Sequence, residues 1–359
     1  MAKKLAFDRW LFSTVAALAG FGLVMVYSAS AAQAAGRAFN PFLVKQGIAG
    51  LLGFALMLLA MHVDYRKLRE PLLVRSLVVG SLLLLILVLL GPELNATRRW
   101  IFLAGVSFQP SELAKLALVA YLAYQIEKKQ DRINSTEMLI PAAAITFLLG
   151  GLVVLEPDLG TAILLGGTAV TLLFLAGLSW RWVAGLAGVA APALYLLVMM
   201  VPYRRARLLT FLDPERDPLG AGFQVLQSLI AVGSGGILGL GPGESLQKLY
   251  FLPYPFSDFI YAIVAEELGL IGAVAVLALF GVLAWRGVLA GLRAPDLFGR
   301  YLGWGITTVL VLQALINISV VIAIFPTKGM PLPFISYGGS SLVMALLLSG
   351  VLLNISQHA

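Results

Sequence analysis

The sequence has no cysteine, only two histidines and few charged residues. Without cysteine there is no disulfide framework, thiolate nucleophile or iron–sulfur site, and His62 and His358 are too few for most zinc or haem sites. Any metal would therefore be a hard cation held by carboxylate and carbonyl oxygens. The sequence alone leaves the identity of such a metal unknown.

Charged residues make up 12% of the 359 residues, and hydrophobic residues make up 60%. A soluble domain carries roughly 25% charged residues, so the composition predicts an integral membrane protein. The net charge of +7 comes mostly from lysines and arginines in segments between apolar runs, which is typical of membrane proteins. Nucleic acid is not an expected partner.

About ten apolar runs are each long enough to cross a bilayer as a helix. They predict an all-α membrane protein, a single polytopic domain over residues 1–359. The first run is too long for a signal peptide and has no Ala-x-Ala cleavage site, so we interpret it as a retained span. The expected spans are 9–30, 42–62, 72–90, 111–126, 138–155, 159–178, 182–201, 258–285, 297–325 and 338–357.

The distribution of lysine and arginine predicts that both termini are cytoplasmic. Most basic residues then lie in the inner segments, whereas the short outer loops hold only Arg37, Lys45, Arg98, Arg99 and Lys328. The one long connection, residues 202–257 between helices 7 and 8, then lies outside. Its apolar stretch 225–232 predicts a short surface helix. The inner basic residues are Lys3, Lys4, Arg9, Arg66, Lys67, Arg69, Arg75, Lys128, Lys129, Arg132, Arg181, Arg286, Arg293 and Arg300.

Asp258 is the most conspicuous charge, because it stands where a long apolar run begins. An unpaired carboxylate beside lipid costs several kcal/mol, so an acid placed there is a functional candidate. The alternative is helix capping, since Ser257 and Asp258 precede the run and acids are favoured at helix N-termini. The spacing alone leaves both open.

Two other charge pairs have similar alternatives. Glu112 and Lys115 lie one helical turn apart, either as a packing pair or as part of a polar cavity. Glu156 and Asp158 flank Pro157, and Asp158 is placed to cap the sixth span, although two carboxylates can also contribute to a divalent cation site.

The long connection carries Arg204, Arg205 and Arg207 close together, with Lys248 further along. Guanidinium groups match phosphate oxygens bidentately, so a pyrophosphate-bearing lipid is a natural ligand. Attraction to anionic headgroups is the alternative. The glycine-rich stretch 233–245 lacks the Gly-Lys-Ser/Thr ending of a P-loop, so nucleotide binding is not expected.

Several of these segments together resemble the SEDS family of polytopic membrane proteins, which includes FtsW, RodA and SpoVE. One departure is that Leu252-Pro253 is followed by Tyr254, where family members often carry glutamate. The matching stretches, in order, are Arg98-Arg99-Trp100, Gln109-Pro110-Ser111-Glu112-Leu113-Ala114-Lys115, Glu156-Pro157-Asp158-Leu159-Gly160-Thr161, Tyr203-Arg204-Arg205, Phe211-Leu212-Asp213-Pro214, Ser245-Leu246-Gln247-Lys248, Ser257-Asp258-Phe259-Ile260-Tyr261, Glu266-Glu267, Pro326-Thr327-Lys328-Gly329 and 332–341.

The resemblance implies a peptidoglycan glycosyltransferase in the bacterial inner membrane that polymerises lipid II on the outer leaflet, in cell division or elongation. It implies a class B penicillin-binding protein as partner, together with other divisome or elongasome membrane proteins. The position matching the family's essential acid is Asp258. The candidate substrate-binding residues are Trp100, Glu112, Lys115, Glu156, Asp158, Arg205, Arg207, Lys248 and Ser341.

No cofactor is certain, but a divalent cation, Mg²⁺ or Mn²⁺, is a candidate for neutralising the leaving pyrophosphate. The main alternative function is a lipid II flippase, a transporter for the same lipid-linked precursor. A non-catalytic scaffold is a third hypothesis, and it does not require the intramembrane charges.

Overall fold

A computed structural model describes residues 7–36, 38–91, 97–103, 106–214, 222–249, 251–327 and 329–359. Lys3, Lys4, Arg37 and Lys328 lie outside the described residues, so the expectations that rest on them have no structural counterpart here.

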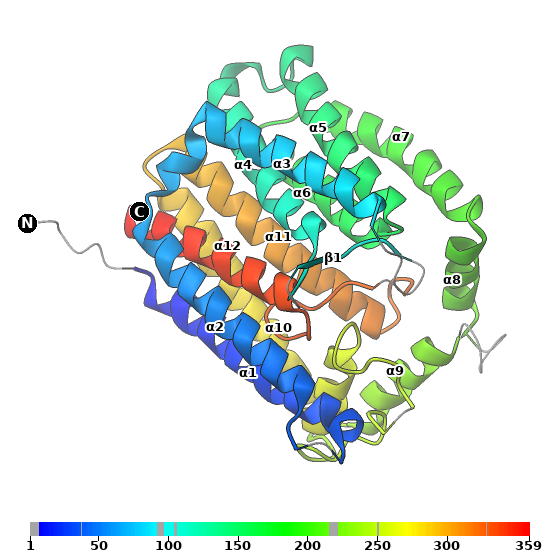
Figure 1. Ribbon diagram of the computed structural model, residues 1–359. Coiled ribbons are helices and arrows are strands. Elements are labelled where there is room, and N and C mark those ends of the chain that lie inside the picture. The colour runs from blue at the N-terminus through cyan, green and yellow to red at the C-terminus, as the bar shows by residue number, and fades with distance from the viewer. Residues whose placement is uncertain are drawn as a thin grey trace, which may run out of the picture.

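The described chain is almost entirely helical and forms one bundle with peripheral elements (Figure 1). Its helices are α1 (Arg9–Ala34), α2 (Pro41–His62), α3 (Pro71–Leu89), α4 (Pro110–Lys128), α5 (Thr136–Leu155), α6 (Leu159–Leu175), α7 (Trp180–Met199), α8 (Pro202–Leu212), α9 (Phe223–Ser234), α10 (Ile260–Arg293), α11 (Leu297–Val321) and α12 (Gly339–Gln357), with 3₁₀ turns η1 (Tyr65–Arg69) and η2 (Gln130–Arg132).

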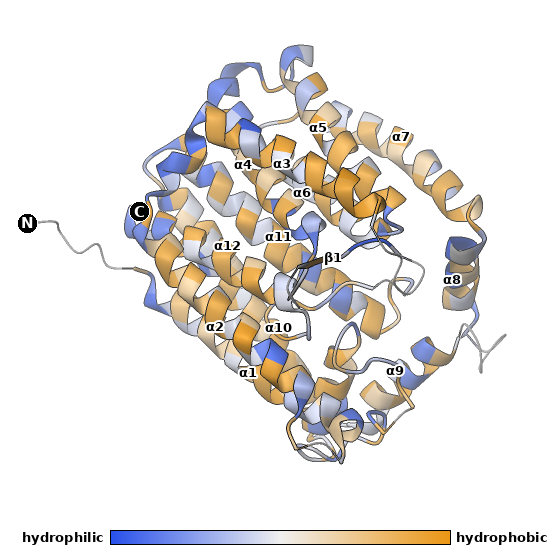
Figure 2. Cartoon of the chain, viewed as in Figure 1, coloured by the Kyte–Doolittle hydropathy of each residue, from blue (hydrophilic) through white to orange (hydrophobic). Residues whose placement is uncertain are grey.

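Eight of the described helices, namely α1, α2, α3, α5, α7, α10, α11 and α12, are long and apolar enough to cross a membrane. The other two expected spans correspond to α4, which carries buried charges, and to α6, which is 17 residues long. Apolar residues cover the eight long helices over most of their length (Figure 2). The prediction of an all-α membrane fold is confirmed, with helices at the ten expected places.

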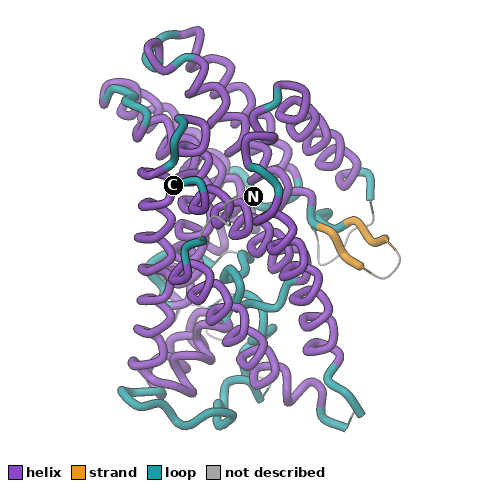
Figure 3. The backbone as a smooth tube through the Cα atoms, turned by 90° about the vertical axis from the view of Figure 1, so that its left-hand side faces the viewer, coloured by secondary structure: helices purple, strands orange, loops and turns teal. Residues whose placement is uncertain are grey.

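A short β-hairpin is an element that the all-α prediction missed, as is the helix α8. Strands β1 (Ile101–Leu103) and β2 (Val106–Phe108) pair antiparallel, with Phe102 opposite Ser107, and project from the helices (Figure 3). Three residues are too few to show an alternating pattern in the sequence. The hairpin carries the chain from Arg99 and Trp100 back to the start of α4.

The helices differ in how deeply they are buried. About 78% of the apolar window of α12 and 61% of that of α11 is buried, whereas α7 has no buried residue in its window. A helix that is apolar on every side and packs only on its neighbours along one edge is suited to contact with lipid. Figure 1 shows α7 at the margin of the bundle, between α6 and α8.

Close contact between α2 and α12 depends on Gly53 and Gly350. A Cβ on Gly350 would lie 2.5 Å from the Met57 carbonyl oxygen, and one on Gly53 would lie 2.7 Å from a Leu346 methyl group. Small residues of this kind let helix backbones approach within a membrane, where packing supplies much of the association energy.

Both termini lie at the same end of the bundle. The Asp8 backbone N–H donates to Ser356 Oγ at 3.3 Å, and Arg286 Nε lies 2.7 Å from Asp8 Oδ2. A chain that crosses a membrane an even number of times has both ends on the same side, so this position of the ends fits the expected ten spans. We refer to this end as the terminal end and to the opposite end, where α10 begins, as the distal end.

The long connection contains α8 and α9, and α9 confirms the expected short helix. After α9 the chain is fixed to a kink in α10 at Gly269, whose φ is 65°. The Leu240 and Gly241 N–H groups donate to the carbonyl oxygens of Glu266 and Glu267, each at 3.0 Å. The kink frees these groups from the regular helix pattern, so the loop is hydrogen-bonded directly to α10.

Candidate functional site

Asp258 lies at the distal end, two residues before α10. The helix begins at Ile260 with Phe259 as its N-cap and has no side-chain capping bond, so the capping alternative for Asp258 is not observed. Within the described chain, the Asp258 carboxylate is only partly exposed and accepts no hydrogen bond. Among the described residues, it is an acid without a hydrogen-bonding or ion-pair partner.

The backbone around Asp258 is held by two polar side chains. Asn317 of α11 donates from Nδ2 to the carbonyl oxygens of Asp258, at 2.8 Å, and of Met330, at 2.7 Å. Ser336 Oγ donates to the Ser257 carbonyl oxygen at 2.7 Å. Because these bonds are made to the main chain, they fix the position of Asp258 and leave its carboxylate free to react.

The electrostatic setting of Asp258 suits a general base. Desolvation by the surrounding protein raises the pKa of Asp258 to about 6, with Arg99 and Arg207 opposing the rise and Asp158 adding to it. A base works best when its pKa lies near the operating pH, because it is then ionised and still basic enough to accept a proton.

Arg99 connects the elements around Asp258. Its Nε donates to the Glu156 carbonyl oxygen at 3.1 Å, a terminal nitrogen donates to the Pro157 carbonyl oxygen, and Nη1 lies 3.8 Å from Asp158 Oδ2. These contacts hold the corner between α5 and α6. A Cβ built on Gly329 would lie 3.8 Å from Arg99 Nη1 and 3.1 Å from Asp258 Oδ2, so both groups border the same point.

Sequence reasoning placed Arg99 in a matching motif but chose its neighbour Trp100 as the candidate site residue. Trp100 is partly buried, directly before β1. Asn317 and Gly329 were also missed as site residues. Asn317 is a polar residue in an apolar run, which was a usable signal, whereas the role of Arg99 depends on the fold.

Asp158 caps α6, as the sequence predicted. Its carboxylate accepts from the Thr161 N–H at 3.0 Å and from Thr161 Oγ1 at 2.9 Å. Glu156 is fully buried, and both of its carboxyl oxygens lack a partner in the described chain. Desolvation, with Asp158 adding to it, raises the pKa of Glu156 to about 8, so this carboxyl group is mostly protonated at neutral pH.

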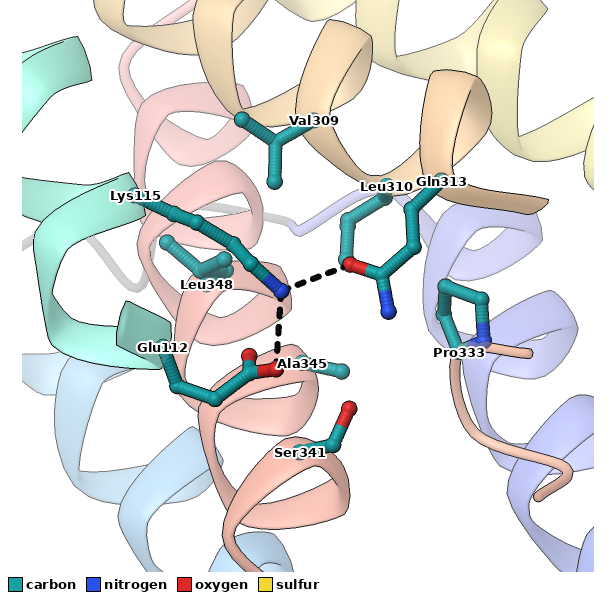
Figure 4. A pocket seen from close by; sticks show the side chains of 9 residues that line it. All are labelled: Glu112, Lys115, Val309, Leu310, Gln313, Pro333, Ser341, Ala345 and Leu348. Atoms are coloured by element: carbon teal, nitrogen blue, oxygen red, sulfur yellow. Dashed lines mark hydrogen bonds and ion pairs between the residues drawn. The ribbon is translucent and has the colours of Figure 1, made fainter. Parts of the chain in front are cut away.

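Glu112 and Lys115 form a buried ion pair on α4 with a 2.8 Å Nζ to Oε1 distance. Lys115 also donates to Gln313 Oε1 of α11 at 2.7 Å. The pair borders a narrow cavity between α4, α11 and α12, which Ser341 also lines (Figure 4). The candidate binding residues Glu112, Lys115 and Ser341 are therefore brought together in the interior of the bundle.

The remaining candidates are distributed differently. Arg207, on α8, donates to the Thr327 carbonyl oxygen at 3.2 Å and acts electrostatically on Asp258, whereas Arg205 on the same helix is exposed. Lys248 lies apart from them, buried against Glu267 at 2.8 Å and hydrogen-bonded to Ser28 of α1 at 3.1 Å. This contact joins the loop to α1 and α10.

A metal centre made only of protein ligands does not fit the described residues. Within the described ranges no three or more histidine, aspartate or glutamate side chains are grouped so that they could hold an ion. Asp158 and Asp258 provide two carboxylates at the distal end, and any cation there would need further oxygens from a bound phosphate group.

Comparison with known proteins places this arrangement in a family. Residues 9–359 match the family model for FtsW, RodA and SpoVE, described as "Cell cycle protein". The chain is 45% identical to the probable peptidoglycan glycosyltransferase FtsW of Geobacter metallireducens, over 98% of this chain and 95% of that protein. It is 41% identical to stage V sporulation protein E of Bacillus subtilis, over 99% of each.

Solved structures support the same family assignment. A chain from a study of structural coordination of polymerization and crosslinking by a peptidoglycan synthase complex superposes with a TM-score of 0.80 at 35% identity, covering 98% of both chains. The rod shape determining protein RodA of Thermus thermophilus superposes with a TM-score of 0.73 at 32% identity, covering 98% of this chain and 97% of that one. By sequence and by fold, this multi-pass membrane protein belongs to the FtsW/RodA/SpoVE family.

Proposed function

We propose that the protein is a peptidoglycan glycosyltransferase that polymerises lipid II by inverting transfer, with Asp258 as the general base. The observation that carries this proposal is the Asp258 carboxylate, which is fixed through its backbone, has no structural partner among the described residues and has a pKa of about 6. Relatives named as peptidoglycan glycosyltransferases support the substrate class.

The reaction needs one base and a way to neutralise a leaving pyrophosphate. The 4-hydroxyl of the acceptor sugar gives its proton to Asp258 while its oxygen bonds to the anomeric carbon of the donor. The bond from that carbon to the pyrophosphate oxygen breaks in the same displacement, and the leaving group keeps the electron pair. A single displacement inverts an α-linked donor into a β-linked product.

Arg99 and Arg207 are the cations whose charge acts on Asp258, so they are best placed to stabilise the leaving pyrophosphate. Arg205 on α8 is exposed and available to the same group. Lys115 and Lys248 already hold buried carboxylates, which suits them to supporting the site. If bound there, Mg²⁺ or Mn²⁺ would be held by the Asp158 carboxylate together with oxygens of the substrate and would add positive charge near the leaving group. Loss of polymerisation on chelation, restored by either ion, is the expected result.

The proposal also includes the setting of the enzyme. The distal end faces the outer leaflet of the bacterial inner membrane, where lipid II is consumed, and the protein works in cell division with a class B penicillin-binding protein and other divisome membrane proteins. The family description as a cell cycle protein and the structural likeness to a chain from a peptidoglycan synthase complex support this setting.

The test is polymerisation of purified lipid II in detergent by wild-type protein, Asp258→Asn and a control, Asp131→Asn. Asp131 is exposed in η2 at the terminal end. Asp258→Asn should purify normally and make no glycan strands, while the control retains activity. Normal strand synthesis by Asp258→Asn would refute the assignment. Detergent removes the two-sided membrane, so a lipid II flippase cannot produce the wild-type result.

A further inference from the structure

Gln313 of α11 joins the buried charge pair of α4 to the segment that lies beside Asp258. Its side chain is 2% exposed, and its Oε1 accepts from Lys115 Nζ at 2.7 Å (Figure 4). At the other end of the amide, Nε2 donates to the Pro331 carbonyl oxygen at 2.9 Å. Lys115 is also paired with Glu112 at 2.8 Å. A continuous series of polar contacts therefore runs from α4 through α11 to Pro331.

Asn317, one helical turn after Gln313, makes a similar contact with the preceding residue of that segment, Met330. Its Nδ2 donates to the Met330 carbonyl oxygen at 2.7 Å and to the Asp258 carbonyl oxygen at 2.8 Å. One nitrogen thus holds two main-chain segments together. Because Met330 and Pro331 are consecutive, the position of Pro331 bears directly on this shared contact.

Lys115 determines which way the Gln313 amide points. A lysine ammonium group can only donate hydrogen bonds, whereas one end of an amide accepts and the other donates. Beside Lys115 the amide must present Oε1, which leaves Nε2 facing the Pro331 carbonyl oxygen. If the amide turned over, two oxygens would face each other and the carbonyl oxygen would lose this donor. The orientation of the amide therefore depends on the lysine.

The surroundings of Lys115 suit a supporting role better than direct contact with substrate. Its side chain is 2% exposed. Two of the three hydrogen-bond donors of its ammonium group are already used by Glu112 and Gln313. Little of the lysine is left for a ligand to touch.

We propose that Lys115 is a positioning residue for the reaction and acts on Asp258 through Gln313. Lys115 orients the amide, the amide holds residues 330–331, and that segment shares Asn317 with the candidate base. This inference rests on the proposed glycosyltransferase function. It gives Lys115 a different role from the substrate binding that the family resemblance implies.

The experiment measures kcat, the KM for purified lipid II and the melting temperature in detergent for Lys115→Met, Gln313→Met and the double variant. Lys115→Met should lower kcat by about 100-fold, the loss that a misplacement of ~1 Å produces, with KM nearly unchanged. Gln313→Met should show the same split between kcat and KM. The double variant should lose little more than either single variant, because both residues act through one series of contacts.

The matched control is Gln125→Met. Gln125 also lies in a helix, α4, and its Nε2 donates to the Tyr121 hydroxyl at 3.0 Å, so the substitution removes a comparable bond away from residues 330–331. The control should keep the wild-type kcat and KM.

A raised KM for lipid II, or losses in kcat that multiply in the double variant, would overturn the positioning role in favour of direct substrate contact. A lower melting temperature with wild-type kcat in the folded protein would reduce both residues to a structural role and overturn it as well. If Lys115→Met does not purify, Gln313→Met decides by its own split between kcat and KM. Activity of Asp258→Asn would instead overturn the proposed function itself.

Discussion

The Glu112–Lys115 pair is a buried ion pair in the candidate site, and a double-mutant cycle tests what it contributes. Its side chains are 6% and 2% exposed, and the two charged atoms lie 2.8 Å apart. The proposed changes are Lys115→Met, Glu112→Gln and the two together; Gln matches Glu in size, and Met keeps the unbranched lysine stem without its charged end. Because Met and Gln are uncharged, the double variant removes both charges at once.

The magnitude follows from burial. Removing one partner of a buried ion pair costs about 3–5 kcal/mol, because the other charge stays buried without compensation. Lys115→Met also leaves Gln313 Oε1 without its 2.7 Å bond, which adds about 1 kcal/mol. The double variant should lie within about 2 kcal/mol of wild type, so the two single losses together should exceed the loss in the double variant by at least about 5 kcal/mol.

Thermal unfolding in one detergent, followed by intrinsic fluorescence, measures the cycle, and lipid II polymerisation is recorded in parallel. At on the order of 2 °C per kcal/mol, Lys115→Met should melt roughly 8 °C below wild type and the double variant much closer to it. Strictly additive losses would refute a coupled pair. A stable double variant that no longer polymerises lipid II would show that the pair also serves the reaction.

Three further predictions concern protonation at the distal end. The rate of polymerisation should fall as the pH decreases through about 6, because a base with a raised pKa is protonated there; a rate that stays level down to pH 4.5 would contradict Asp258 as the base. Arg99→Ala should move this acid limb to higher pH, since Arg99 holds the pKa of Asp258 down, whereas an unchanged limb with a uniformly lower rate would reduce Arg99 to a structural role. Glu156→Gln should raise the melting temperature more at pH 9 than at pH 5, because the folded-state pKa of about 8 lies above the ordinary 4.5, so wild-type stability falls as the pH rises between these values. Exposed Glu137→Gln is the matched control, and equal shifts at both pH values would argue against a protonated Glu156.

Much of the fold was predictable because membrane spans obey local rules. An apolar run must satisfy its backbone hydrogen bonds internally, so each long run becomes a helix. The capping role of Asp158 was equally local, since its acceptor lies three residues from the Thr161 N–H that it binds. The β-hairpin after Trp100 was missed because strands of three residues leave no periodic signal.

The sequence by itself determined the class of the protein, the positions of its helices, the family resemblance and Asp258 as the leading acid. Only the tertiary structure decided between capping and a free carboxylate at Asp258, and only it brought Arg99 and Gly329 to the same point. Arg99 lies more than 150 positions before Asp258 in the sequence, and Gly329 lies 71 positions after it. Helix formation follows from local sequence patterns, but the meeting of a base and a cation depends on how segments far apart in the chain pack together.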